Sequence, residues 1–292
     1  MSNIQEGHIA VTGGNVWYRI VGAEKKGTPL ITLHGGPGFP HDYLESLEAL
    51  ADERPVVFYD QLGCGNSDRP DDVSLWTVER FVQELGQLRA ALHLDRAHLL
   101  GQSWGTILTM DYLLTKPKGI ASVIFASGCF SIPRFAADAR MLLQGMPAEI
   151  REIIERNEAA GTFDSEEYQG AVFAFYAKHV CRLDPWPDSL MASLGGLGQQ
   201  VYGTMWGASE FTINGSLATY DRTNRLGELN VPILYTCGRY DEVTPEASAA
   251  YQQITPRSRL VVFENSAHMA HLEERELYLN TVREFLHEAE AR

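Results

Sequence analysis

The chain has 292 residues, of which 45% are hydrophobic and 21% are charged. This composition is typical of globular proteins with a full core, and it excludes the disordered and collagen-like classes. Asp and Glu outnumber Lys and Arg by 38 to 24, which gives a formal net charge of −14. We therefore expect neither nucleic acid nor an anionic membrane among its partners.

Several features bear on the cellular compartment. The N-terminal stretch MSNIQEGHIAV lacks the basic start and the apolar run of a signal peptide. No apolar run approaches the ~20 residues of a membrane span. The four cysteines include no C-x-x-C pair, and we expect buried free thiols rather than disulfides at Cys64, Cys129, Cys181 and Cys237. A cytoplasmic protein is the expectation.

The expected strands follow one another along the chain. Residues 8–21 predict a hairpin of two strands around Gly13-Gly14-Asn15. Apolar, β-branched runs that end in Gly- or Asp-rich loops then predict strands at residues 29–36, 55–63, 97–103, 121–128, 231–238 and 258–266. Hydrophobicity in these runs is continuous rather than alternating, which favours strands buried on both faces of a sheet.

Segments with helical spacing lie between these runs, notably residues 77–92 and 273–287. Strands that alternate with helices predict an α/β protein with a mostly parallel sheet flanked by helices. Between about 130 and 225 the chain is helical, polar and rich in aromatic residues, with no convincing buried strand. We therefore expect a core formed by residues 1–129 and 226–292, and an inserted helical cap at residues 130–225.

The stretch LLGQSWGTI places Ser103 at G-x-S-x-G spacing between an apolar run and a helical segment. A serine at a strand-to-helix turn is the context of a nucleophile elbow, which exposes the hydroxyl at the carboxyl edge of the sheet. The helix that begins there also offers free N–H groups to an oxyanion. The alternative role for Ser103 is that of a helix N-cap.

A serine nucleophile needs a base and an acid that orients this base. His268 follows the last predicted strand and Asp241 follows the strand before it, so both are candidates. The chain order Ser103, Asp241, His268 is that of α/β-hydrolases. His271 is expected on the surface of a helix, and Asp241 has the alternative role of an ordinary loop residue.

An oxyanion hole is predicted from the glycine-rich loop HGGPG, residues 34–38. A tetrahedral intermediate needs backbone N–H donors aimed at its oxygen. We expect one donor near Gly36 and the other at Trp104, the residue after the nucleophile. His34 is expected to support the loop through hydrogen bonds.

Five motifs together resemble the prolyl iminopeptidase branch of the α/β-hydrolases: HGGPG, DQLGCGNSDRP, GQSWGT, GRYDEVTP and SAHMAHLEE. Many relatives have a second glycine where this chain has Thr106. The resemblance implies an α/β-hydrolase fold and an enzyme that releases an N-terminal residue, often proline, from a small peptide or an amide with a free α-amine. That branch of the α/β-hydrolases also includes the tricorn-interacting aminopeptidases and related amino-acid amidases.

The resemblance further implies two glutamates that bind the substrate amine, Glu210 in the cap and Glu242 beside the acid. Two carboxylates suit the donors of an α-ammonium group. The alternative for both is a solvated loop carboxylate. Four cap aromatics either wall a pocket for an apolar or pyrrolidine side chain or form the core of the cap: Trp186, Tyr202, Trp206 and Phe211.

The sequence leaves other functions open. One alternative is an esterase or amidase that removes an aminoacyl group from a small metabolite. Another is a binding protein that kept the fold without catalysis. We expect no metal and no cofactor, because the chain has no H-E-x-x-H motif, no His/Cys cluster, and no G-x-G-x-x-G or Walker spacing. The oligomeric state is left open.

Overall fold

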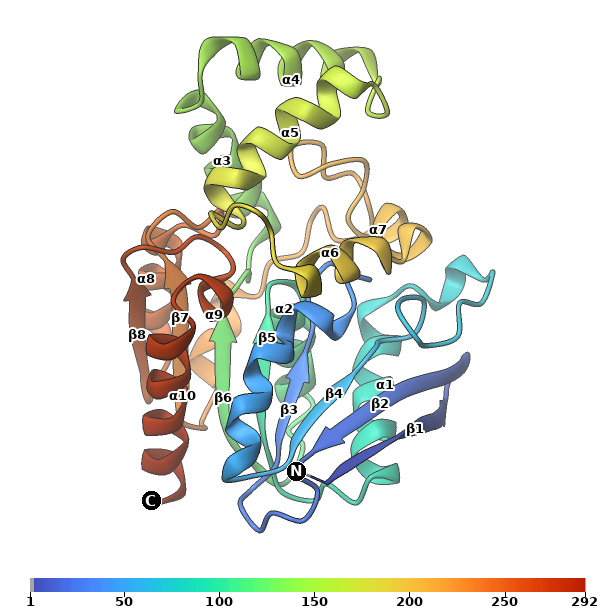
Figure 1. The fold of residues 1–292 in the computed structure, drawn as a ribbon, viewed down its shortest axis with the longest axis vertical. Coiled ribbons are helices and arrows are strands. Elements are labelled where there is room, and N and C mark those ends of the chain that lie inside the picture. Colours follow the sequence, from blue (N-terminus) through green and yellow to red (C-terminus); the bar gives the residue numbers. More distant parts are fainter. Residues whose placement is uncertain (1–2, 292) are drawn as a thin grey trace.

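The fold is built on one eight-stranded sheet, seen here in a computed structural model that describes residues 3–291. The strand order is β1-β2-β4-β3-β5-β6-β7-β8 (Figure 1). β1, β2 and β4 pair antiparallel, and every later pair is parallel. The strands are Ile4–Val11, Gly14–Val21, Leu30–Leu33, Val56–Tyr59, Ala97–Gln102, Ile120–Ala126, Ile233–Gly238 and Ser258–Phe263. The predicted hairpin and the mostly parallel sheet are confirmed.

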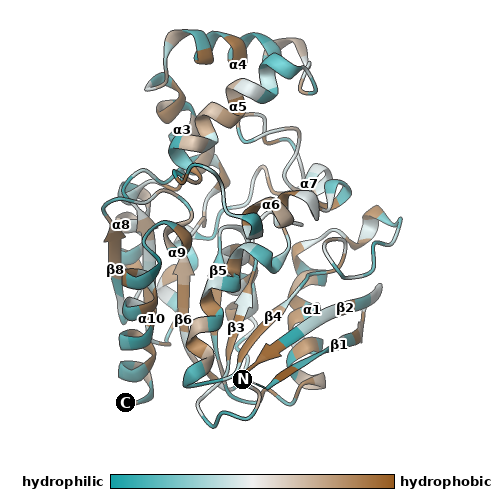
Figure 2. Ribbon diagram, viewed as in Figure 1, coloured by the Kyte–Doolittle hydropathy of each residue, from teal (hydrophilic) through white to brown (hydrophobic). Residues whose placement is uncertain are grey.

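The middle of the sheet is closed to water on both faces. Every residue of β3, β4, β5 and β7 is buried. Figure 2 shows the same strands in hydrophobic colours between helices of mixed character. Helices cover both faces of these strands, which is why their sequences are continuous apolar runs.

Two sets of helices cover the two faces. Side chains of α1 (Val78–Ala91), α2 (Trp104–Leu114) and α8 (Pro245–Ile254) share one hydrophobic cluster. Those of η1 (His41–Asp52) and α10 (Arg275–Glu290) belong to the other. The short elements are η2 (Val73–Leu75), η3 (Thr223–Glu228) and α9 (Ala270–Glu273). The helices predicted near residues 77–92 and 273–287 are confirmed as α1 and α10.

The segment expected as a helical cap leaves the sheet after β6 and returns before β7. It carries α3 (Ile132–Gln144), α4 (Ala148–Ala160), α5 (Glu166–His179), α6 (Asp188–Gly195) and α7 (Gln199–Met205). Figure 1 shows these helices beyond the carboxyl ends of the strands. An isolated bridge between Ser131 and Asp221 joins the two chain passages at its base, and the Ser131 hydroxyl donates to Asp221 Oδ2 at 2.8 Å.

α6 and its flanking residues are bonded directly to the loops that follow β3 and β4. The N–H of Gly65 donates to the carbonyl of Gly196 at 3.1 Å, and that of Gly198 donates to Gly38 at 2.8 Å. The Ser193 hydroxyl of α6 donates to the Pro40 carbonyl at 2.9 Å. This part of the segment is therefore anchored to the core.

Two further findings concern the described residues. The four cysteines are free and buried, as predicted. Within residues 3–291 no helix combines the length and the apolar character needed to cross a bilayer.

Candidate active site

Ser103 lies in a sharp turn between β5 and α2. Its backbone has φ 54° and ψ −120°, a conformation that costs a non-glycine residue about 1–3 kcal/mol. Its N–H donates to the Ala126 carbonyl at 3.0 Å, and its own carbonyl accepts from the Thr106 N–H at 2.8 Å. A Cβ on Gly101 or Gly105 would collide with backbone atoms, so the tight turn requires both glycines. The turn holds the partly exposed serine at the carboxyl end of the central strand.

His268 and Asp241 form a buried pair at the carboxyl ends of β8 and β7. His268 Nδ1 lies 2.7 Å from Asp241 Oδ1, with the two residues 4% and 1% exposed. Burial disfavours the charged imidazole, but the carboxylates of Asp241, Glu242 and Glu210 raise the pKa of His268 to about 9. The arrangement fixes the imidazole so that Nε2 is the nitrogen left to take a proton.

The histidine loop is bonded to the serine turn. The side-chain amide of Gln102, the residue before Ser103, donates to the His268 carbonyl at 3.4 Å. The Ser127 hydroxyl, at the end of β6, donates to Asp241 Oδ2 at 2.6 Å. The structure thus places Ser103, Asp241 and His268 after β5, β7 and β8, at the carboxyl ends of strands along one edge of the sheet.

The glycine-rich loop approaches the serine from β3. A Cβ on Gly35 would lie 3.2 Å from the Ser103 Cβ. The Gly35 N–H donates to the Tyr43 hydroxyl at 2.8 Å, so this donor is occupied. Among residues 3–291, no protein acceptor takes the N–H of Gly36 or that of Trp104. Both N–H groups are therefore free to donate to a bound group.

Glu242 and Glu210 are acidic groups without a Lys or Arg partner among the described residues. Glu242 is 6% exposed; its Oε1 lies 3.8 Å from His268 Nε2, and its Oε2 has no partner. The Tyr202 hydroxyl donates to Glu210 Oε1 at 2.6 Å. Burial raises the pKa of both carboxyls, and the charge of Glu210 raises the pKa of Glu242 further. Such a pair favours a bound cation.

The loop that carries Glu210 is held by Glu158, near the end of α4. The hydroxyl of Ser209 donates to Glu158 Oε1 at 2.6 Å, and Thr212 donates to the other oxygen. Tyr168 of α5 donates to Oε1 as well. Ser209 also accepts from the N–H of Thr212 at 2.9 Å. Glu158 therefore ties the loop around Glu210 to the α4–α5 pair.

Three of the four cap aromatics belong to or pack against the hydrophobic cluster that α1 and α2 share. The ring of Trp206 is 6.5 Å from that of Tyr202, and Phe211 packs edge-on against Phe175 of α5 at 5.0 Å. The fourth, Trp186, packs at a tilt against the exposed Phe173, with ring centroids 4.8 Å apart, and donates to a backbone carbonyl. The structure thus does not group Trp186 with the other three.

Sequence reasoning missed two polar residues at this site. Ser127 follows β6, and the strand-end rule that selected Asp241 would have found it. Burial and the charges of Glu210 and Glu242 raise the pKa of Tyr176 well above its usual value. No local motif marks Tyr176.

The surface position expected for His271 is wrong. This histidine is 2% exposed, and its Nε2 lies 3.1 Å from the Tyr43 carbonyl. Burial lowers its pKa to about 3, so the ring is neutral. The prediction failed because α9 is a single turn that packs against η1, so His271 has no solvent-facing side to occupy.

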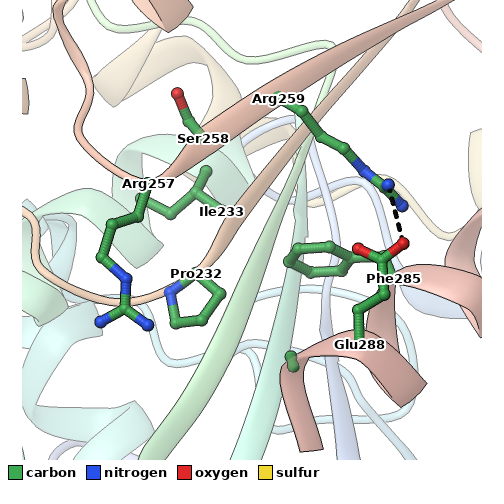
Figure 3. A pocket seen from close by; sticks show the side chains of 8 residues that line it. Pro232, Ile233, Arg257, Ser258, Arg259, Phe285 and Glu288 are labelled. Atoms are coloured by element: carbon green, nitrogen blue, oxygen red, sulfur yellow. Dashed lines mark hydrogen bonds and ion pairs between the residues drawn. The ribbon is translucent and has the colours of Figure 1, made fainter. Parts of the chain in front are cut away.

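Two cavities lie away from these residues. One, of about 230 Å³, lies where β7 and β8 begin and is lined by Ile233, Arg257 and Arg259 together with residues of α10 (Figure 3). Arg259 there is paired with Glu288 at 3.1 Å. The other, of about 350 Å³, is bordered by Leu113 and residues near η3. Neither contains a candidate site residue. No cluster of potential metal ligands occurs within the described part of the chain.

Comparison with known proteins identifies the family. The model of the alpha/beta hydrolase fold family matches residues 28–275. The proline iminopeptidase of Heyndrickxia coagulans is 49% identical over 282 residues, which are 96% of this chain and 98% of that protein. The proline iminopeptidase of Saccharolobus solfataricus is 38% identical over 287 residues, covering 97% and 93%.

Solved structures agree with these relatives. The proline iminopeptidase of Mycobacterium smegmatis superposes with a TM-score of 0.91 at 34% identity, over 98% of each chain. VinJ superposes with a TM-score of 0.94 at 34% identity, over 98% of this chain and 99% of its own. The fold class and the family predicted from the motifs are confirmed. The chain belongs to the proline iminopeptidase family of serine hydrolases with the α/β-hydrolase fold.

Proposed function

We propose that the chain releases an N-terminal proline, or another small apolar residue, from peptides with a free α-amine. The observation that carries this proposal is the pair of carboxyls that act on His268: the buried Glu242, whose Oε1 lies 3.8 Å from His268 Nε2, and the partly buried Glu210, whose charge also raises the pKa of His268. A general esterase has no need of unpaired acidic groups near its base, because burying them is costly.

In the proposed reaction, the Ser103 hydroxyl attacks the scissile carbonyl carbon while its proton passes to His268 Nε2. Asp241 holds the Nδ1–H and stabilises the imidazolium. The N–H groups of Gly36 and Trp104 stabilise the oxyanion. The C–N bond then breaks, and the leaving amine takes the proton from Nε2.

Water completes the cycle. It attacks the ester formed on Ser103, gives one proton to His268, and releases the amino acid while the proton returns to the serine oxygen. The cap segment covers this edge of the sheet, and Glu210 of the segment lies near Glu242 of the core. The substrate is therefore held between the two.

The proposed specificity follows from the donors of the substrate amine. The ammonium of an N-terminal proline has two N–H groups, and two carboxylates provide one acceptor for each. A substrate blocked at nitrogen leaves both acidic groups without a partner, which costs several kcal/mol. The bond after the first residue is then the one presented to Ser103.

The test compares prolyl-4-nitroanilide with its N-acetylated form, using the wild type and Ser103→Ala. We expect fast hydrolysis of the free-amine compound, little of the acetylated one, and none by the variant. Equal rates for both compounds would indicate an esterase or amidase without amine recognition. Full activity of Ser103→Ala would refute the proposed nucleophile.

A further inference from the structure

Gln61 bonds to both loops that carry the candidate oxyanion donors. It follows β4, and β3 lies between β4 and β5 in the sheet. Its side-chain Nε2 donates to the His34 carbonyl at 3.1 Å, and its Oε1 accepts from the Trp104 indole at 2.8 Å. All three residues are at most 1% exposed. One buried amide thus spans the loop after β3 and the turn after β5.

On the β3 side, Gln61 acts through His34. The backbone N–H of Gln61 donates to His34 Nε2 at 2.9 Å, so the ring proton resides on Nδ1. Burial lowers the pKa of His34 to about 4, which keeps the ring neutral. Nδ1 then donates to the Gly35 carbonyl at 3.1 Å. That carbonyl and the N–H of Gly36 belong to the same planar peptide unit.

This chain of contacts fixes the direction of the first donor. Because the carbonyl and N–H of a trans peptide point in opposite directions, holding the Gly35 oxygen aims the Gly36 N–H the other way. The preceding peptide is also held at both ends: its carbonyl accepts from Gln61, and its N–H donates to Tyr43. Gly36 has φ 107°, and a Cβ there would lie 2.6 Å from the backbone nitrogen of Phe39.

On the β5 side, Gln61 holds the residue that supplies the second donor. Trp104 is the first residue of α2, where backbone N–H groups have no partner within the helix. Its indole is fixed by Gln61 and packs edge-on against Phe81 at 5.6 Å. The position of the Trp104 backbone is therefore coupled to that of Gln61.

We propose that Gln61 is a positioning residue that sets the spacing and direction of the two oxyanion donors, Gly36 and Trp104. This inference rests on the proposed function, which assigns those donors. It predicts an effect on the transition state rather than on the binding of the substrate amine, because Gln61 contacts the donor loops and not the two glutamates.

The first experiment compares Gln61→Met with Gln87→Met. Gln87 is a control for a glutamine side chain that both accepts and donates without joining two loops: it accepts from the Thr12 N–H and donates to the Thr12 hydroxyl at a partly buried position. The measurements are the rate of Ser103 phosphonylation by a fluorophosphonate, kcat and KM for prolyl-4-nitroanilide, inhibition by free proline, and Tm. Phosphonylation needs the oxyanion donors but not the amine site.

We expect Gln61→Met to lower both kcat and the phosphonylation rate by about 30-fold, less than the loss of a whole donor. Inhibition by proline and KM should change little, whereas Tm should fall further than in Gln87→Met, because Gln61→Met leaves two buried polar groups without a partner. Unchanged phosphonylation in Gln61→Met would overturn the inference while the proposed function stands. A wild type that is not labelled at Ser103 would overturn both.

The single variant Trp104→Phe breaks the same bridge from its other end, so it keeps the proposal testable if Gln61→Met is poorly folded. Trp104→Phe removes the indole N–H together with part of the buried ring, so kcat should fall by at least about 5-fold. If the indole acts through Gln61, the double variant should be no slower than Gln61→Met alone. If the losses in kcat multiply instead, Gln61 and Trp104 act independently, and the proposed bridge between them is refuted.

Discussion

Glu210→Gln is the substitution that best isolates recognition of the substrate amine. Glutamine has nearly the same shape, and its oxygen still accepts from the Tyr202 hydroxyl, which lies 2.6 Å from Oε1 in the wild type. The change removes one negative charge and leaves the serine turn and the acid–base pair intact. Its effect should therefore be far larger on substrates with a free ammonium group than on blocked substrates, which respond only to the lower pKa of His268.

The expected magnitude follows from the position of Glu210. A hydrogen bond to a charged group contributes about 1.5–3 kcal/mol, and more where the remaining charge is fully buried. Glu210 is only partly buried, so we expect about 2–3 kcal/mol in the transition state. At 1.36 kcal/mol per tenfold change, kcat/KM for prolyl-4-nitroanilide should fall by about 30- to 160-fold.

The assay measures kcat/KM for the free-amine anilide and its N-acetylated form with both proteins. Glu210→Gln should leave the slow hydrolysis of the acetylated compound unchanged or slightly faster. Tyr202→Phe is the control, since it keeps the carboxylate and should cost about 5-fold. A Glu210→Gln variant that loses both activities equally, or neither, would refute amine recognition by this residue.

Other changes test the surroundings of the site. Ser127→Ala removes the hydrogen bond to the second oxygen of the acid, so kcat should fall by about 5- to 30-fold with KM unchanged; a change in KM alone would contradict this. Glu158→Gln weakens the bonds that hold the loop around Glu210, so it should raise KM several-fold without slowing fluorophosphonate labelling. Glu152→Gln, on the exposed face of the same helix, should change neither KM nor the labelling rate. Glu242→Gln removes a negative charge that raises the pKa of His268, so the acid limb of the pH profile of kcat/KM should move to lower pH. An acid limb at the same or a higher pH would show that Glu242 does not raise the pKa of His268.

The fold was predictable where one strong local pattern controlled each element. The central strands are buried on both faces, so their sequences are continuous apolar runs that local reading detects. α1 has both a clear apolar stripe and a Thr77 side chain that accepts from the Arg80 N–H. In contrast, η1 follows a proline-containing loop without a capping side chain, and its position depends on packing against α10.

The site was predictable in its strand-end residues and not in the contacts that hold them. Ser103, Asp241 and His268 each follow a predicted strand, and parallel strands bring their carboxyl ends to one edge. The bonds from Gln61 to Trp104 and from Glu158 to Ser209 join residues 43 and 51 positions apart. No spacing in the sequence specifies such pairs, because they arise only once the sheet and the cap segment have packed.

The central claim is an acyl-enzyme formed on Ser103 from a substrate with a free α-amine. It is tested most directly by acid-quenching the enzyme during turnover of a prolyl ester and mapping the acyl group by mass spectrometry of the digested protein. The account predicts a prolyl group on the peptide that contains Ser103, and none when the ester is N-acetylated. A prolyl group on another residue, or equal labelling by both esters, would contradict it.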